Sequence, residues 1–180
     1  MSVLRGKTIK SKIVYQGTFL KIAQDLVEGR EGKKHRREYI LHPGASVVVA
    51  ILPDGKFVME RQYRHALQQE FLELPAGKLD PGEDPLAAAR RELKEETGFE
   101  AREWTRLGVI HPCIGYSNEF IEVFLAKGLE QTGAQPDEGE ELEVLSLSQE
   151  ELDEEIRAGR LTDAKTLSAL MLYQRSRKDP

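Results

Sequence analysis

Apolar and polar residues alternate along the first part of the chain at the spacing of β-strands. This alternation predicts strands over residues 8–15 and 19–27 on either side of a turn at Gly17, followed by a polar loop over 28–34. We therefore expect residues 1–40 to form a small β extension that precedes a larger domain over 41–180.

Longer apolar runs begin in the larger domain. Residues 45–52 are apolar and β-branched, residues 53–55 are Pro-Asp-Gly, and residues 56–63 resume the strand pattern. Two such runs around a turn favour a hairpin whose first strand is buried. A further strand is predicted over 71–74, and it breaks into a loop at 75–77, which is Pro-Ala-Gly.

A helix over residues 85–97 is bounded by suitable residues at both ends. Asp84 offers a carboxylate for the N-cap, Pro85 suits the first helical position, and Gly98 suits the left-handed residue that ends many helices. This helix is therefore predicted from its termini as well as from its periodicity.

The C-terminal half contains further strand-like and helical patterns. Strands are predicted over 107–110, 120–126 and 142–147. Ser148 and Glu151 form a capping box for a helix that ends near Gly159. A last helix is predicted over 163–175, with one apolar stripe made by Leu167, Leu170 and Met171. The order of elements predicts an α/β fold, a mixed sandwich rather than a doubly wound sheet.

The composition argues against several classes of protein. The 180 residues include 26 basic and 31 acidic side chains, a net charge of −5, which argues against a broad face for nucleic-acid polymers. Cys113 is the single cysteine, so neither an internal disulfide nor a cysteine zinc site can form, and a reducing cytoplasmic location fits. No apolar run is long enough to span a membrane, and no leader segment is recognised.

The helix over 85–97 carries more acids than a surface helix needs. At 100° per residue, Glu92, Glu95 and Glu96 share an arc of roughly 100°, and an apolar stripe adjoins it. Like charges at this spacing destabilise a helix, and Arg91 supplies only one compensating charge. Oxygen ligands without Cys or His suit Mg²⁺ or Mn²⁺ shared with substrate phosphates. The alternative is a solvated, salt-bridged helix face.

The spacing around this helix matches a known signature. Gly77 is followed after five residues by Glu83, and after seven more by Arg91-Glu92-Leu93-Lys94-Glu95-Glu96-Thr97-Gly98-Phe99. This chain resembles the Nudix hydrolases, which cleave a nucleoside diphosphate linked to another group with divalent metals. The resemblance implies a Nudix-type α/β/α sandwich with a mixed sheet, preceded here by the N-terminal β extension.

The resemblance also implies roles for the signature residues. The metal ion would be Mg²⁺ or Mn²⁺. Its ligands would be Glu92, Glu95, Glu96 and the backbone carbonyl of Ala76. Glu83 would support this site, and Arg91 would orient Glu95.

Other segments narrow the resemblance to the ADP-ribose and nucleoside-diphosphate-sugar pyrophosphatases. They are the N-terminal β extension, residues 60–64, residues 73–77, the run 115–119 that ends in Glu119, and a late acidic loop. In that group the N-terminal strands form a homodimer that shares the site. The substrate-binding residues would be Arg64, Arg61 or Arg37 at the diphosphate, Tyr15 or Phe19 at the base, and Glu119.

One departure keeps a second substrate class open. ADP-ribose-specific members carry a proline where this chain has Ile114, and Tyr116 lies near a tyrosine of the dinucleoside-polyphosphate hydrolases. The alternatives are therefore a dinucleoside polyphosphate hydrolase, or a catalytically silent Nudix fold that senses nucleotides. For an ADP-ribose enzyme, the resemblance implies a general base in the acidic loop 137–141, with Glu140 as first choice and Glu138 as second.

Overall fold

The computed structural model describes residues 6–133 and 141–177, and the described chain divides into two units. Unit 1 consists of Met1–Pro43 together with Cys113–Glu119, and unit 2 of Gly44–Pro112 together with Phe120–Pro180. The segment Cys113–Glu119, which the sequence analysis assigned to the larger domain, thus groups with the N-terminal strands.

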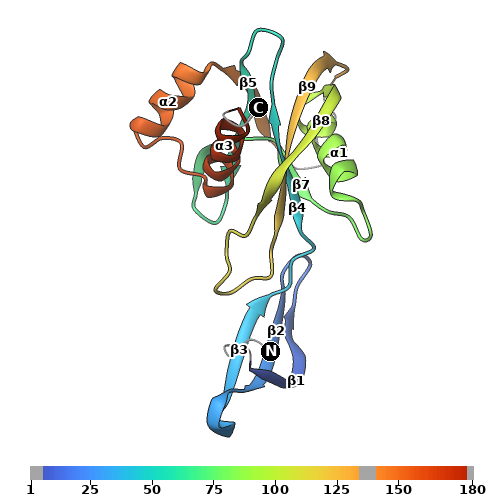
Figure 1. Cartoon of the computed structure of the whole chain (residues 1–180), viewed down its shortest axis with the longest axis vertical. Coiled ribbons are helices and arrows are strands. Elements are labelled where there is room, and N and C mark those ends of the chain that lie inside the picture. The colour runs from blue at the N-terminus through green and yellow to red at the C-terminus, as the bar shows by residue number, and fades with distance from the viewer. Residues whose placement is uncertain (1–5, 134–140, 178–180) are drawn as a thin grey trace. The chain divides into compact units, whose positions relative to one another are not determined.

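Unit 1 is built on an antiparallel sheet of order β1-β2-β3 (Figure 1). Its strands are β1 (Lys7–Gln16), β2 (Lys21–Glu28) and β3 (Lys34–Ile40), and the short 3₁₀ helix η1 (Arg30–Gly32) lies in the predicted polar loop. The two predicted strands around Gly17 are confirmed. The backbone of the 113–119 segment joins this sheet, because Ile40 N donates to Tyr116 O at 2.8 Å.

Unit 2 contains two sheets. The order β10-β5-β6 is antiparallel, whereas the order β7-β4-β9-β8 is mixed because β4 and β9 run parallel. The strands are β4 (Ala45–Ala50), β5 (Phe57–Arg64), β6 (Gln69–Glu73), β7 (Ala76–Lys78), β8 (Phe99–Ile110), β9 (Ile121–Gln131) and β10 (Leu142–Leu147). The predicted mixed α/β sandwich is confirmed.

Helices cover unit 2 on opposite sides of the sheets, as Figure 1 shows. They are α1 (Pro85–Thr97), α2 (Gln149–Arg157) and α3 (Ala164–Ser176). Strand β4 is buried along its whole length because it has a hydrophobic cluster on each face: Val47 packs in the cluster that includes Leu170 of α3, and Val48 in the cluster that includes Leu93 of α1. Alternation along the strand sends these neighbouring side chains to opposite faces.

Three details of the sequence prediction are wrong. The turn at 53–55 forms, but β4 and β5 enter different sheets, because β4 pairs with β9 and β7 instead. The antiparallel contact around the turn consists of the bridge Ile51–Phe57 and the hydrogen bond from Leu52 N to Lys56 O at 2.9 Å. The predicted loop 75–77 contains the start of β7, which pairs with β4. Met171 is 62% exposed, so the buried face of α3 is made by Thr166, Ala169, Leu170 and Tyr173.

Among the described residues, no helix is both long enough and apolar enough to cross a membrane.

Candidate active site on helix α1

Helix α1 begins and ends at the predicted residues. The side chain of Asp84 accepts hydrogen bonds from the backbone of Leu86 at 3.0 Å and of Ala87 at 3.2 Å. Gly98 ends the helix in the left-handed conformation, with φ 72°. Leu93 is fully buried and Glu96 is only 5% exposed, so the apolar stripe draws one of the acids into the edge of the core.

The guanidinium of Arg91 joins the acids of the signature. Its Nε and Nη2 donate to Glu83 at 3.0 and 2.9 Å, and its Nη1 donates to Glu92 at 2.8 Å and to Glu95 at 3.0 Å. Nη2 also donates to the carbonyl of Lys78 in β7 at 3.1 Å. One planar fork therefore links the helix, the loop before it and the edge strand.

These contacts have electrostatic consequences. Hydrogen bonds to Glu83, followed by the charge of Glu92, raise the pKa of Arg91 despite its partial burial. The hydrogen bonds from Arg91 hold the pKa of Glu83 below its ordinary value. Three carboxylates, those of Glu83, Glu92 and Glu95, therefore surround a single guanidinium.

Glu96 and Glu92 contact the strand that precedes the helix. The backbone N–H of Ala76 donates to Glu96 Oε2 at 3.0 Å, which fixes the backbone next to the carbonyl that the sequence analysis named as a ligand. A Cβ added to Gly77 would lie 1.8 Å from Glu92 Oε1. A side chain at this position would therefore displace the carboxylate of Glu92.

The oxygen donors of α1 fit a divalent metal in type but do not converge on one point. Within residues 6–133 and 141–177, no three His, Cys, Asp or Glu side chains converge as a metal-binding group. The reason is visible in the hydrogen bonds: Glu92 and Glu95 turn toward Arg91, and Glu96 toward Ala76. The donors themselves fit a hard cation, since they are oxygen atoms on one helix face, and Gly77 leaves a cradle for one of them.

The two predicted arginines of β5 have different partners. Arg61 Nη1 pairs with Glu143 of β10 at 2.6 Å. Arg64 donates from Nε and Nη2 to both oxygens of Glu73 at 2.7 and 2.6 Å. These hydrogen bonds raise the pKa of Arg64, and the negative charges of Glu73, Asp163 and Glu96 add to the effect. Of the two, Arg64 is the one that pairs with Glu73, the residue just before the segment that leads into α1.

Four residues that the sequence analysis did not assign a role form a chain of contacts that starts at Arg64. They are Glu73, Asp163, Lys165 and Thr166. Asp163 could be recognised as a helix start, and Glu73 belongs to the segment 73–77, but nothing in the pattern pairs a lysine near the C-terminus with β6. That pairing depends on the packing of α3.

Four of the remaining predicted residues belong to unit 1. Tyr15 and Phe19 are 53% and 54% exposed. The ring of Phe19 packs edge-on against that of His42, with 6.1 Å between the ring centroids. Glu119 lies 3.8 Å from His42 Nε2, and Arg37 donates to the backbone carbonyl of Arg36. All four predicted residues are in unit 1. Glu138 and Glu140, the candidates for the general base, lie outside the described residues.

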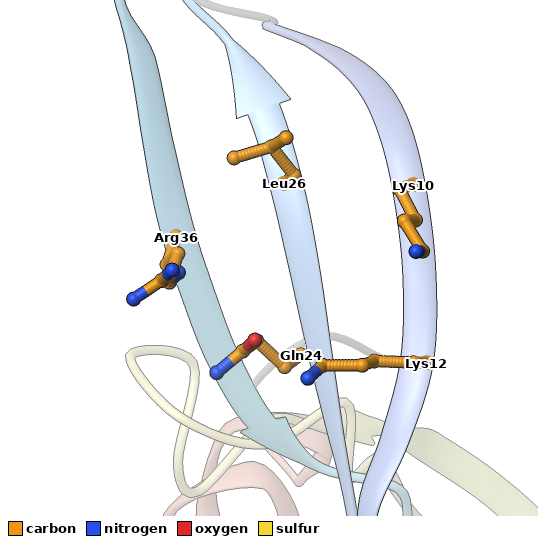
Figure 2. Close-up of a pocket in the computed structure, with 5 residues that line it drawn as sticks. All are labelled: Lys10, Lys12, Gln24, Leu26 and Arg36. Carbon is orange, nitrogen blue, oxygen red and sulfur yellow. The ribbon is translucent and has the colours of Figure 1, made fainter.

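A shallow groove crosses the sheet of unit 1 (Figure 2). It measures about 200 Å³ and is lined by Lys10, Lys12, Gln24, Leu26 and Arg36. Arg37 follows Arg36 along β3, so its side chain emerges from the other face of the sheet. The predicted arginine is therefore not part of this groove.

Comparison with known proteins identifies the family. The NUDIX domain model matches residues 41–170. The chain is 39% identical over 170 residues to a methanol dehydrogenase activator from Bacillus methanolicus (93% of this chain, 92% of that protein) and 35% identical over 176 residues to an ADP-ribose pyrophosphatase from Bacillus subtilis (97% and 95%). A crystal structure of an ADP compounds hydrolase shares the fold, with a TM-score of 0.87 at 24% identity over 99% of this chain and 97% of that one. The chain belongs to the NUDIX family.

Proposed function

We propose that this enzyme hydrolyses the pyrophosphate bond of ADP-ribose or a related nucleoside diphosphate sugar, using Mg²⁺ or Mn²⁺. The products are a nucleoside monophosphate and a sugar phosphate. The observation that carries the proposal is the acidic face of α1 together with the loop before it. Glu96 is buried beside Ala76, and Glu92 and Glu95 share Arg91 with Glu83 of the loop. The similarity to an ADP-ribose pyrophosphatase over nearly the whole chain supports the substrate class.

In this proposal the metal is held by Glu92, Glu95 and Glu96 together with the carbonyl of Ala76. A divalent metal held there would supply positive charge against the diphosphate oxygens and would activate water for attack. Arg91 keeps Glu92 and Glu95 on the same side of the helix, and Glu83 keeps Arg91 in place. Catalysis then depends on positioning and on charge, as expected for the transfer of a phosphoryl group to water.

The substrate's other groups are assigned to residues outside the signature. Arg64 binds the diphosphate, with Arg61 and Arg37 as further candidates, because a guanidinium matches phosphate oxygens with paired N–H donors. Tyr15 or Phe19 stacks on the base, and Glu119 contacts the substrate. The exposure of both aromatic rings in unit 1 supports their availability for stacking.

We also propose a homodimer formed through the N-terminal strands. Strand β1 is an edge of its sheet, and several of its apolar side chains are exposed, among them Ile9, Ile13 and Val14. An exposed apolar edge strand is a ready site for pairing with another chain. The proposed location is the cytoplasm, which suits the free Cys113, and the proposed partners are small nucleotides rather than nucleic-acid polymers or membranes.

The general base is proposed to be Glu140, with Glu138 as the second candidate. We expect Glu140→Gln to lower kcat by about a hundredfold, since general-base catalysis contributes on that scale, and to leave KM nearly unchanged. Initial rates at saturating substrate and Mg²⁺ measure this effect, with Glu138→Gln measured in parallel. If both variants keep wild-type kcat, the base lies elsewhere.

A panel of substrates tests the proposed function. The wild-type enzyme is incubated with ADP-ribose, UDP-glucose, GDP-mannose and diadenosine polyphosphates, each with Mg²⁺ and with Mn²⁺, and the products are separated by chromatography. We expect the highest kcat/KM for ADP-ribose or a nucleotide sugar. Preference for the diadenosine polyphosphates would replace the substrate assignment, and lack of turnover with every compound would favour a silent nucleotide sensor.

A further inference from the structure

Residues 74–76, which lead into the candidate active site, each make a backbone hydrogen bond that holds them in place. Leu74 N donates to Thr166 Oγ1 at 2.9 Å, Val48 N donates to Pro75 O at 2.9 Å, and Ala76 N donates to Glu96. The first of these contacts comes from the first turn of α3, which is far from the signature in sequence. Helix α3 therefore takes part in positioning a segment that the signature residues also contact.

The same turn of α3 carries a lysine that reaches Glu73. Lys165 Nζ contacts Glu73 Oε2 and donates to Asp163 Oδ2 at 2.9 Å. Asp163 is also the N-cap of α3, because its side chain accepts a hydrogen bond from Thr166 N at 3.0 Å. Thr166 is fully buried, so the backbone that carries Lys165 is anchored on both sides.

Glu73 is shared between Lys165 and Arg64. The two oxygens of Glu73 accept the fork formed by Nε and Nη2 of Arg64, while Lys165 contacts one of the same oxygens. The side chain of Glu73 is 5% exposed and that of Lys165 15%, whereas that of Arg64 is 44% exposed. A guanidinium has five N–H donors, so the edge of Arg64 that includes Nη1 lies outside this fork.

The four charges balance. Arg64 and Lys165 contribute two positive charges, and Glu73 and Asp163 two negative ones. Burial favours protonation of Glu73, but the hydrogen bonds from Arg64 and the charge of Lys165 outweigh it and hold its pKa below the ordinary value. Without Lys165, Arg64 would be the one cation left in this group to compensate two acids. The repulsion from Lys165 would be gone, so the net negative charge would hold Arg64 more strongly.

We propose that Lys165 is a positioning residue: by sharing Glu73 and Asp163, it leaves the outer edge of the Arg64 guanidinium available for the substrate's diphosphate. The proposal rests on the proposed function, because it assigns the diphosphate to Arg64. It adds a residue of α3, outside the signature, to the set that determines substrate affinity.

The test combines Lys165→Met with Arg64→Met in a double-mutant cycle. With the best substrate of the panel, we expect Lys165→Met to raise KM about tenfold with kcat changed less than about threefold, since it weakens binding in ground and transition states alike. In the Arg64→Met background the same change should have almost no effect on KM. Lys165→Arg keeps the charge and should restore the wild-type KM.

Two further variants separate positioning from folding. Lys127→Met removes an exposed lysine of β9 and should leave both kinetic parameters unchanged. Lys165→Gln keeps a donor for Glu73 but lacks the charge, so it should reproduce the rise in KM if Lys165→Met does not fold. An unchanged KM in folded Lys165→Gln, or a rise that persists in the Arg64→Met background, would overturn the proposal. If the wild type turns over nothing in the panel, the proposed function fails instead.

Discussion

Replacing Glu96 with glutamine is expected to lower kcat by about a hundredfold or more while leaving the fold intact, since loss of the charge of this proposed metal ligand would act directly on transition-state stabilisation. The amide oxygen of glutamine can still accept the hydrogen bond from Ala76 N, and its volume matches that of the buried carboxylate. The substitution therefore removes a charge and little else. Steady-state kinetics at saturating Mg²⁺ and a thermal melt measure the two effects.

Glu103→Gln is the matched control for this change. Glu103 is exposed on β8 and has the same charge and size, so its replacement should leave kcat and the thermal midpoint unchanged. A Glu96→Gln enzyme that retains more than about half of the wild-type kcat would argue that this carboxylate is not a metal ligand.

Replacing Arg91 with methionine is expected to reduce both activity and stability. Three carboxylates would lose their shared cation, and we expect about 1 to 3 kcal/mol of lost stability because the group is only partly buried. We expect kcat/KM to fall by about a hundredfold, because small misplacements of ligands are costly. Added Mg²⁺ should recover part of the lost stability, since a bound cation relieves the same repulsion.

Arg90→Met is the control for the charge change on α1. The guanidinium of Arg90 lies 5.8 Å from the centre of the Trp104 ring, and Arg90 forms no ion pair within the described residues. Its replacement should leave kcat/KM nearly unchanged. Equal effects of the two substitutions on the Mg²⁺ dependence of the thermal midpoint would contradict the role given to Arg91.

Helix α1 and its acids could be predicted because the information is local. Asp84 and Gly98 fix the ends of the helix, and the 100° rotation per residue then places Glu92, Glu95 and Glu96 on one face. Strand β10 was predictable for the same reason, since its pattern is local. So was the capping box of α2, in which Ser148 and Glu151 bind each other's backbone N–H.

The pairing of strands could not be predicted from local pattern. The turn after β4 is typical of a hairpin, yet β4 pairs with β7 and with β9, which lies much later in the sequence. A strand whose side chains are all buried needs partners and covering helices on both faces, and these come from distant parts of the chain. The same limit applies to Lys165, whose contact with Glu73 spans 92 residues.

Binding of Mn²⁺ in the presence of a non-cleavable α,β-methylene analogue of ADP-ribose tests the metal assignment most directly, with paramagnetic resonance as the readout. We predict that the wild-type protein binds Mn²⁺ and that its affinity for the ion rises when the analogue is added. Glu96→Gln should lose this binding, while Glu103→Gln should keep it. Equal Mn²⁺ binding by wild type and Glu96→Gln would contradict the account.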